Sequence, residues 1–308
     1  MKQRRADKKQ GGKRVDWEKI NRPADCPVIT IITSTYNASE DLPWTINSIK
    51  SQKYPYIQWI VVDGASKDGT VKLLEDNSDI IDVWISEPDK GIYDAWNKAT
   101  KYIKGDWVQF VGAGDEYNDP LTLLNISKLI GPSYPNHDIA YGRLKIINRT
   151  NRRIIEEVGE PWEKLRGKWE LFRPMLPVHP EVFHHSCLFK EDKVFDKTFK
   201  VAGDCHFLMK QIPKKDFLYI PINIIKMTDG GVSGKFKSFI LATLESRRAS
   251  KILGFKPPIS HCIREGTKFS LKLIILSLYP EKHQRAIFNI LKSVFRKCKN
   301  FPKIMFHQ

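Results

Sequence analysis

The feature that most constrains the fold is an alternation of short apolar segments with segments of helical spacing. Between the apolar segments, apolar side chains recur three or four residues apart, as in amphipathic helices. Strands that alternate with helices form a mostly parallel sheet. The sequence therefore predicts an α/β fold, a Rossmann-like sheet with helices on both faces. The predicted strands cover residues 28–33, 57–62, 80–85 and 107–111.

Polar residues and glycines follow each of these strands where the strand ends. In an open parallel sheet, ligands bind outside the carboxyl ends of the strands. Carboxylates there can bind ribose or sugar hydroxyls, or hold a hard cation beside a diphosphate. Asp and Gly are also common in turns and helix caps, which explains one such segment more readily than four. We expect one crevice formed by residues 34–37, 63–66, 87–91 and 114–116.

The rest of the chain divides by its local pattern. A β-ribbon is predicted over residues 139–147 and 153–158, and a loop or lid over 160–179, which holds three prolines and two tryptophans. Residues 203–212 have helical spacing, and the chain is helical from 235 onward with a break near 254–258. We predict a disordered basic arm over 1–22, an α/β domain over 23–235 and a helical C-terminal region over 236–308.

The net charge of +16 is confined to the two ends of the chain. Residues 1–22 hold nine Lys and Arg against three Asp and Glu, and residues 251–308 hold twelve against two. Residues 23–249 hold thirty of each kind. A neutral body is poorly suited to coating nucleic acid, so we expect no nucleic-acid partner.

The cysteines and the apolar runs indicate the compartment. Five cysteines without a CxxC pair argue against a disulfide framework and a structural zinc site, and they fit a reducing environment. No apolar run has the length of a membrane span, and the N-terminus lacks the apolar core of a signal peptide. We expect a cytoplasmic protein, free or bound peripherally to the inner face of the cell membrane.

Five motifs, in order and at matching spacing, resemble the family 2 glycosyltransferases of the GT-A fold. They resemble most the branch that builds bacterial surface polysaccharides of the colanic-acid and O-antigen type. The resemblance covers about residues 27–235. The motifs are Thr35-Tyr36-Asn37, Val61–Thr70, Ser86–Lys98, Phe195–Asp204 and Asp229–Ser233.

The resemblance implies transfer of a hexose from a nucleotide sugar to a hydroxyl of a glycan or lipid-linked acceptor. UDP is the nucleotide that the family favours. The family contacts its nucleotide at Thr35 and Asp63, with Asp63 toward the base, and Asp89 lines the same pocket. The full set expected to bind the nucleotide sugar is Thr35, Tyr36, Asn37, Asp63, Ser66, Asp89, Lys90, Gly91, Asn97 and Gly114.

The resemblance also implies a divalent cation, Mn²⁺ or Mg²⁺. Asp115 falls at the last acid of the family's metal-binding cluster, and His184 is a second candidate because imidazole is a common metal ligand. A packing role is the alternative for His184. The chain departs from the family pattern at Gly112 and Gly114, where aspartates are common, so only Asp115 and Glu116 remain acidic.

Asp204 falls where the family places its catalytic base. A base there would deprotonate the acceptor hydroxyl, and one base without a covalent nucleophile predicts inversion at the anomeric carbon. The alternative is that Asp204 only caps a helix, which is the commonest task of an Asp at a helix start.

Two other classes of function remain open. A sugar nucleotidyltransferase would carry a Gly-rich basic loop after the first strand, where this chain has Ser34-Thr35-Tyr36-Asn37. A non-catalytic membrane or nucleic-acid adaptor would use the basic ends, but it leaves the carboxylates unexplained.

The C-terminal helices place apolar residues on one face among basic residues. Such a face lies on an anionic membrane or packs on the protein itself. The apolar residues are Phe269, Leu273, Leu276, Ile287, Ile290, Leu291, Val294, Phe295 and Cys298.

Overall fold

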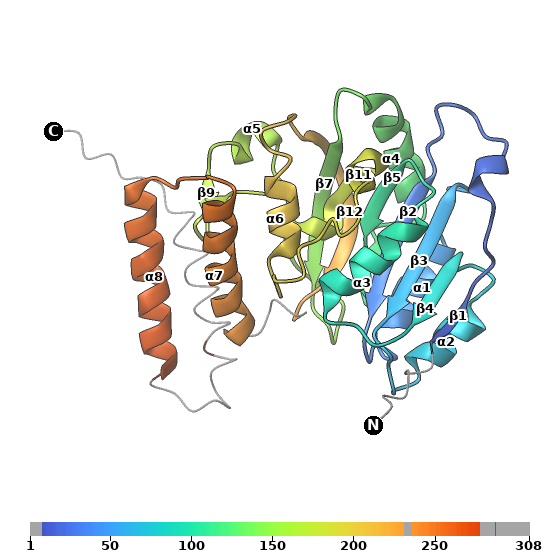
Figure 1. Cartoon of the computed structure of the whole chain (residues 1–308), viewed down its shortest axis with the longest axis horizontal. Coiled ribbons are helices and arrows are strands. Elements are labelled where there is room, and N and C mark those ends of the chain that lie inside the picture. Colours follow the sequence, from blue (N-terminus) through green and yellow to red (C-terminus); the bar gives the residue numbers. More distant parts are fainter. Residues whose placement is uncertain (1–7, 231–235, 278–286, 288–308) are drawn as a thin grey trace. The chain divides into compact units, whose positions relative to one another are not determined.

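A computed structural model describes residues 8–230, 236–277 and 287. The chain forms two compact units (Figure 1). The first unit comprises Met1–Lys168 and Met175–Asp229, and the second comprises Trp169–Pro174 and Gly230–Gln308.

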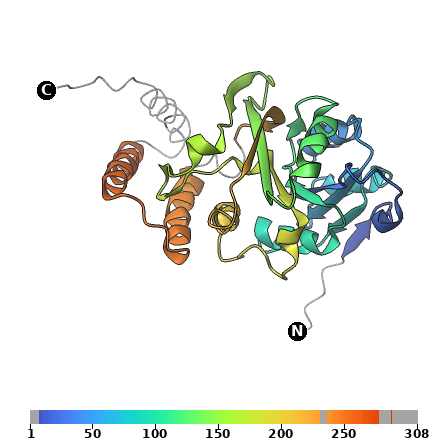
Figure 2. The same cartoon turned by 90° about the horizontal axis from the view of Figure 1, so that it is seen from above.

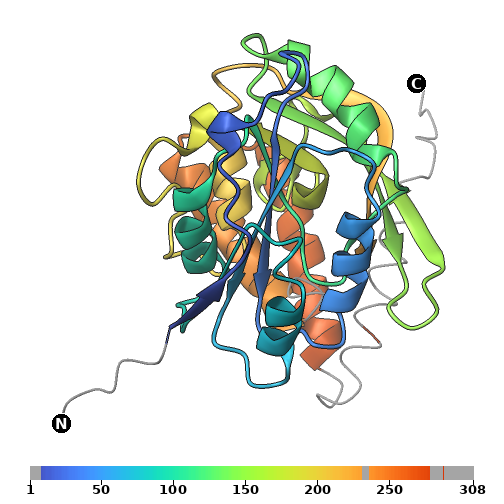
Figure 3. The ribbon, with the colours of Figure 1, turned by 90° about the vertical axis from the view of Figure 1, so that its right-hand side faces the viewer.

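The N-terminal half of the first unit is the predicted parallel sheet. Its strands lie in the order β4-β3-β2-β5, and each pair is parallel. α3 covers one face of the sheet and α1 the other (Figure 3), as expected for this fold class. The elements are β2 (Ile29–Thr35), α1 (Leu42–Lys50), β3 (Ile57–Asp63), α2 (Thr70–Asp76), β4 (Val83–Ser86), α3 (Ile92–Ala99) and β5 (Trp107–Phe110).

The second half extends the same sheet in mixed orientation, in the order β5-β11-β7-β12-β6 (Figure 2). The predicted ribbon is present, because β8 pairs antiparallel with β7. Three strands were not predicted: β6 is only two residues long, β11 is only four residues long, and β12 contains Pro221 and irregular pairing between Tyr219 and Asn223. The elements are β6 (Glu116–Tyr117), α4 (Thr122–Ile130), β7 (Ile139–Ile147), β8 (Ile154–Val158), α5 (Trp162–Leu165), β11 (Val182–His185), α6 (Gly203–Met209) and β12 (Leu218–Thr228).

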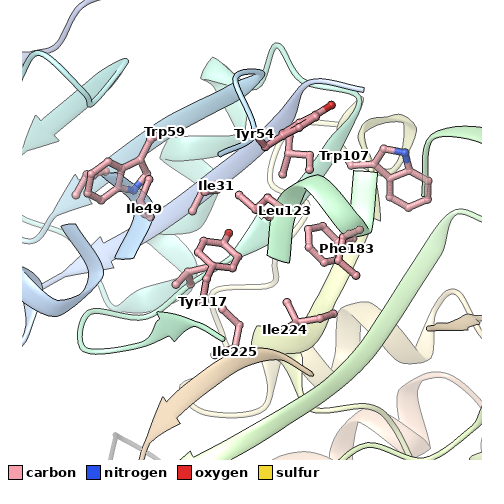
Figure 4. Packing of buried hydrophobic residues seen from close by; sticks show 14 of the residues in the cluster. Ile31, Ile49, Tyr54, Trp59, Trp107, Tyr117, Leu123, Phe183, Ile224 and Ile225 are labelled. Carbon is pink, nitrogen blue, oxygen red and sulfur yellow. The ribbon is translucent and has the colours of Figure 1, made fainter. Parts of the chain in front are cut away.

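The apolar residues of the strands, α1 and α4 form one buried cluster on one face of the sheet (Figure 4). Trp59, Trp107 and Phe183 are almost wholly buried in it. Burying one large apolar side chain contributes about 1.5–3 kcal/mol. This packing fixes the strands, and therefore it also fixes the loops at their carboxyl ends.

The basic arm predicted to be disordered is ordered from residue 8 onward, which corrects that prediction. β1 (Lys9–Gly11) pairs antiparallel with β4. Trp17 is buried, and its Nε1 donates to Asp82 Oδ1 at 2.8 Å. Asp82 lies in an otherwise apolar segment and is 1% exposed, so its carboxylate needs a buried donor. The arm supplies one such donor from Trp17, and the backbone N–H of Trp59 donates to the other oxygen, Oδ2, at 2.9 Å.

In the part that the structure describes, the second unit contains two helices and a small β-ribbon. The predicted break is present, because α7 ends before Gly254, whose φ is +74°, and α8 begins after Pro258. Within the described ranges, no helix has the length and apolar character needed to cross a membrane. Of the residues predicted for the apolar face beyond Ser277, all but Ile287 lie outside the described residues. The elements are β9 (Trp169–Glu170), β10 (Arg173–Pro174), α7 (Phe236–Ile252) and α8 (Ile259–Ser277).

Candidate active site

The carboxyl ends of β2, β3 and β4 are joined through one buried carboxylate, that of Asp63. Thr35 Oγ1 donates to Asp63 Oδ1 at 2.9 Å, and Ser86 Oγ donates to Oδ2 at 2.7 Å. Ser66 donates to both oxygens, from its hydroxyl to Oδ1 and from its backbone N–H to Oδ2. These four donors match the four lone-pair sites of a carboxylate. Asp63 therefore shapes the strand ends, and its predicted contact with a base would require one of these donors to leave.

Tyr36 and Asp89 flank Gly64, just beyond Asp63. A methyl group at Gly64 would lie 2.8 Å from Asp89 Oδ2 and 3.2 Å from the Tyr36 ring. The Tyr36 side chain is 69% exposed. Asn37 adopts a φ of +48°, and its Oδ1 accepts from the backbone N–H of Lys67 at 3.0 Å. The structure thus brings the Tyr36 ring and the Asp89 carboxylate together at Gly64, where a side chain would be crowded by both.

The turn from β4 into α3 holds Asp89, Lys90 and Gly91, and Asn97 lies in α3 itself. Asp89 Oδ1 accepts from Gly91 N at 2.8 Å, and Gly91 needs its φ of +112° to make this turn. Lys90 is exposed beside them. Asn97 is placed differently from the prediction: its buried amide donates to Phe195 O at 2.7 Å and accepts from Phe195 N at 2.9 Å. Asn97 therefore holds the 195 loop, and it does not point a free amide to the strand ends.

Asp115 lies at the corner after β5. Its Oδ2 accepts from Gly112 N at 3.2 Å and its Oδ1 from Thr228 N at 3.1 Å. Gly114, with a φ of +94°, receives the Thr228 hydroxyl on its carbonyl at 2.7 Å. Burial raises the pKa of Asp115 to about 7, while the two backbone donors and Arg152 oppose that rise. Asp115 is 7% exposed. Both of its described hydrogen-bond donors are uncharged backbone N–H groups.

Arg152 reaches the same corner from the turn between β7 and β8, and no motif in the sequence indicated it. Its guanidinium donates to Thr228 Oγ1 at 2.9 Å and to the carboxylate of Glu116. It also lies 4.6 Å from the centre of the Trp44 ring. No fixed spacing links a hairpin turn to a strand end, so only the fold places this cation beside Asp115.

Asp204 lies in the first turn of α6, and its carboxylate accepts from the Tyr93 hydroxyl at 3.1 Å. Ala202 is the residue at the N-cap, so Asp204 is not the capping residue. A methyl group at Gly203 would lie 2.8 Å from the Tyr93 ring, so glycine permits the close approach. Tyr93 lies in the first turn of α3, the helix that follows β4 and the turn 87–91. The hydrogen bond therefore places Asp204 at the edge where the strands end.

Among the described residues, His184 belongs to no group of three His, Cys, Asp or Glu side chains that could hold a metal ion, which differs from its expected role as a metal ligand. The ring is fully buried between Phe110, Phe207 and His179, with centroid distances of 5.1–5.8 Å. Burial lowers the pKa of His184 well below its usual value. The residue packs as a neutral ring in an aromatic cluster.

The sequence of residues 30–195 matches the family described as Glycosyl transferase family 2. The chain belongs to this family. Its enzyme class, glycosyltransferase, was expected from the motifs and is confirmed at this level.

Three known proteins illustrate the relationship. The PGL/p-HBAD biosynthesis glycosyltransferase of Mycobacterium bovis is 28% identical over 187 residues, which are 59% of this chain and 68% of that protein. TarS 1–349 of S. aureus has a TM-score of 0.52 at 22% identity; the match covers 65% of this chain and 60% of the TarS fragment. The mannosyltransferase PcManGT of Pyrobaculum calidifontis, in complex with GDP-Man and Mn²⁺, has a TM-score of 0.54 at 18% identity, over 79% of this chain and 70% of PcManGT. At such identities the two structures show the shared fold, which is GT-A.

Proposed function

We propose that this protein transfers a hexose from a UDP-sugar to a hydroxyl of a glycan or lipid-linked acceptor, in the synthesis of a surface polysaccharide. The observation that carries the proposal is the hydrogen bond from Tyr93 to Asp204. It brings a carboxylate from α6 to the strand edge that already holds Tyr36, Asp89 and Asp115. TarS has been crystallised with UDP-GlcNAc, which supports the choice of UDP.

Asp204 acts as the general base in this proposal. Its carboxylate takes the proton of the acceptor hydroxyl while that oxygen attacks the anomeric carbon and the nucleoside diphosphate leaves. Burial raises the pKa of Tyr93 far above its usual value, so its hydroxyl stays protonated and holds Asp204 in one orientation. Because the displacement is direct, the product has the opposite anomeric configuration to the donor.

Glycosyltransferases of the GT-A fold commonly use a divalent cation, and Mn²⁺ or Mg²⁺ is the expected cofactor. The described donor set does not fit such an ion as it stands. Both oxygens of Asp115 accept backbone N–H groups. Within the described ranges, no three His, Cys, Asp or Glu side chains are grouped to hold a metal. We therefore assign no step of the reaction to a metal.

The test of the function is release of UDP from a panel of UDP- and GDP-sugars, with a lipid-linked or polysaccharide acceptor present. Transfer supports the proposal, and NMR of the anomeric proton of the product should show inversion. Incorporation of pyrophosphate into a nucleotide sugar, without transfer to an acceptor, would indicate the nucleotidyltransferase alternative.

Peripheral attachment to an anionic membrane is a further part of the proposal. On α8, Ile259, Ile263 and Ile274 are 80%, 63% and 59% exposed, which supports an apolar contact surface. Phe269 instead lies 6.2 Å from the Phe239 ring and packs against α7. The protein should co-sediment with anionic vesicles at low salt and less so at high salt. Failure to sediment at low salt would contradict the attachment.

A further inference from the structure

The turn between β7 and β8, residues 148–153, carries two arginines to the corner at Asp115. Arg149 pairs with Asp41 at 3.0 Å, and Arg152 pairs with Glu116. Arg152 also lies within 3.4 Å of the Gly114 carbonyl. This turn therefore brings positive charge to the one place where the family pattern has lost acidic residues.

The backbone of the turn indicates that the Arg152 side chain is there for a reason other than turn formation. Arg152 has a φ of +56°, a region that favours glycine and asparagine. The Asn148 side chain accepts from the backbone N–H groups of Thr150 and Asn151 and already shapes the turn. An arginine is unfavourable at the positive φ of position 152. The reason for an arginine there must therefore lie in the contacts of its side chain.

The surroundings of the guanidinium are those of a group held ready for an anion. It is about one-fifth exposed, lies against the Trp44 ring and is paired with a carboxylate, Glu116, that is equally exposed. Burial lowers the pKa of Arg152, and the nearby carboxylates of Asp115 and Asp41 oppose that change. A guanidinium presents a planar fork of N–H donors that matches two phosphate oxygens at once.

We propose that Arg152 binds the diphosphate of the nucleotide sugar and supplies beside Asp115 the positive charge that a metal ion supplies in related enzymes. This inference rests on the proposed function, because it assigns the diphosphate of that donor to the corner. Before the donor binds, Glu116 holds the guanidinium in place. When the diphosphate binds, its oxygens replace the Glu116 carboxylate, and the arginine then stabilises the charge that develops on the leaving group.

The test is isothermal titration calorimetry of the full chain with inorganic pyrophosphate and with UDP, in EDTA and then with Mg²⁺. The wild type should bind both ligands in EDTA. Arg152→Ala should weaken both by at least tenfold, Arg152→Lys should weaken them less, and Arg153→Ala, one residue along the same turn and exposed, should leave them unchanged. Glu116→Gln should strengthen binding several-fold, because it removes the competing carboxylate. A purely structural ion pair predicts the same sign for Glu116→Gln and Arg152→Ala.

Arg152→Gly guards against a simple loss of folding. Glycine suits the positive φ, so this variant should unfold at no lower temperature than wild type and should still lose pyrophosphate binding. Equal binding by wild type and Arg152→Ala, or wild-type binding that needs Mg²⁺, would overturn the inference. Arg152-dependent pyrophosphate binding without transfer of any sugar would leave the inference standing and overturn the proposed function. Transfer that is unaffected in both Arg152→Ala and Arg152→Gly would overturn the inference and leave the proposed function standing.

Discussion

Asp63 and Asp115 are both aspartates just at or beyond the carboxyl end of a parallel strand, yet their surroundings differ. Asp63 receives four hydrogen bonds, three of them from hydroxyl groups. Asp115 receives two, both from backbone N–H groups, with nitrogen–oxygen distances of 3.1 and 3.2 Å. The carboxylate at the end of β3 is thus fully hydrogen-bonded within the protein.

Among the described residues, Asp115 and Asp204 have fewer hydrogen-bond donors than Asp63. Asp204 has a hydrogen bond from Tyr93, at 3.1 Å. A carboxylate with few protein donors keeps lone pairs for a substrate, whereas one with four serves the fold. A position at a strand end therefore does not by itself distinguish a reactive acid from a structural one.

The largest effect that we expect is on turnover, from a substitution of Asp204. Asp204→Asn should lower kcat by at least about 10²-fold, because the amide cannot take the acceptor proton. UDP affinity and thermal unfolding should stay close to wild type, as measured by calorimetry and circular dichroism. Asp192→Asn, on an exposed loop residue nearby in sequence, is the matched control. A variant that keeps more than a tenth of wild-type turnover would show that Asp204 is not the base.

The next effect is on stability. Asp63→Asn replaces two acceptor oxygens with one, so buried hydroxyl and N–H donors lose partners, at about 1–3 kcal/mol for each unsatisfied group. We expect a total loss of roughly 2–4 kcal/mol in the free energy of unfolding, measured in urea. Asp79→Asn, at an exposed position, should change it by less than about 0.5 kcal/mol. If both variants are equally stable, the contrast between Asp63 and Asp115 has no energetic basis.

The smallest effect is a pH dependence from Glu181, which is buried and lies directly before β11. Burial raises its pKa to about 8, and the backbone N–H of Val178 opposes the rise. Because the folded state binds this proton more tightly than the unfolded state, the stabilisation is complete below the unfolded pKa and disappears as the pH rises toward 8. Relative to Glu181→Gln, the wild type should lose about 2 kcal/mol between pH 5.5 and 7, at about 1.4 kcal/mol per pH unit. Parallel pH profiles for the two proteins would show that the carboxyl titrates normally.

The parallel half of the sheet could be predicted because its signal is local. β2, β3, β4 and β5 are apolar runs, each followed by polar residues, and the helical segments between them indicate parallel strands. The motif residues could be placed at the strand ends for the same reason. What could not be predicted depends on contacts between distant segments. Pairing of β1 with β4 and the reach of Arg152 to Glu116 have no spacing in the sequence that announces them.

Two predicted roles failed because burial outweighed residue type. Asn97 and His184 are polar residues that suit ligand binding, but the fold turns the first to the backbone of Phe195 and the second into an aromatic cluster. Neither helical spacing nor a strand pattern reveals which polar side chain will be enclosed.

The pairing of β1 with β4 also has a consequence for how the protein forms during translation. β1 leaves the ribosome before β2, β3 and the helices between them, yet its partner β4 is made after all of these. Until β4 emerges, Trp17 has no Asp82 to bind and stays in water. The fluorescence of the Trp17 indole should therefore shift only when synthesis has passed β4, and Trp17 then reports that β3 and β4 have been made.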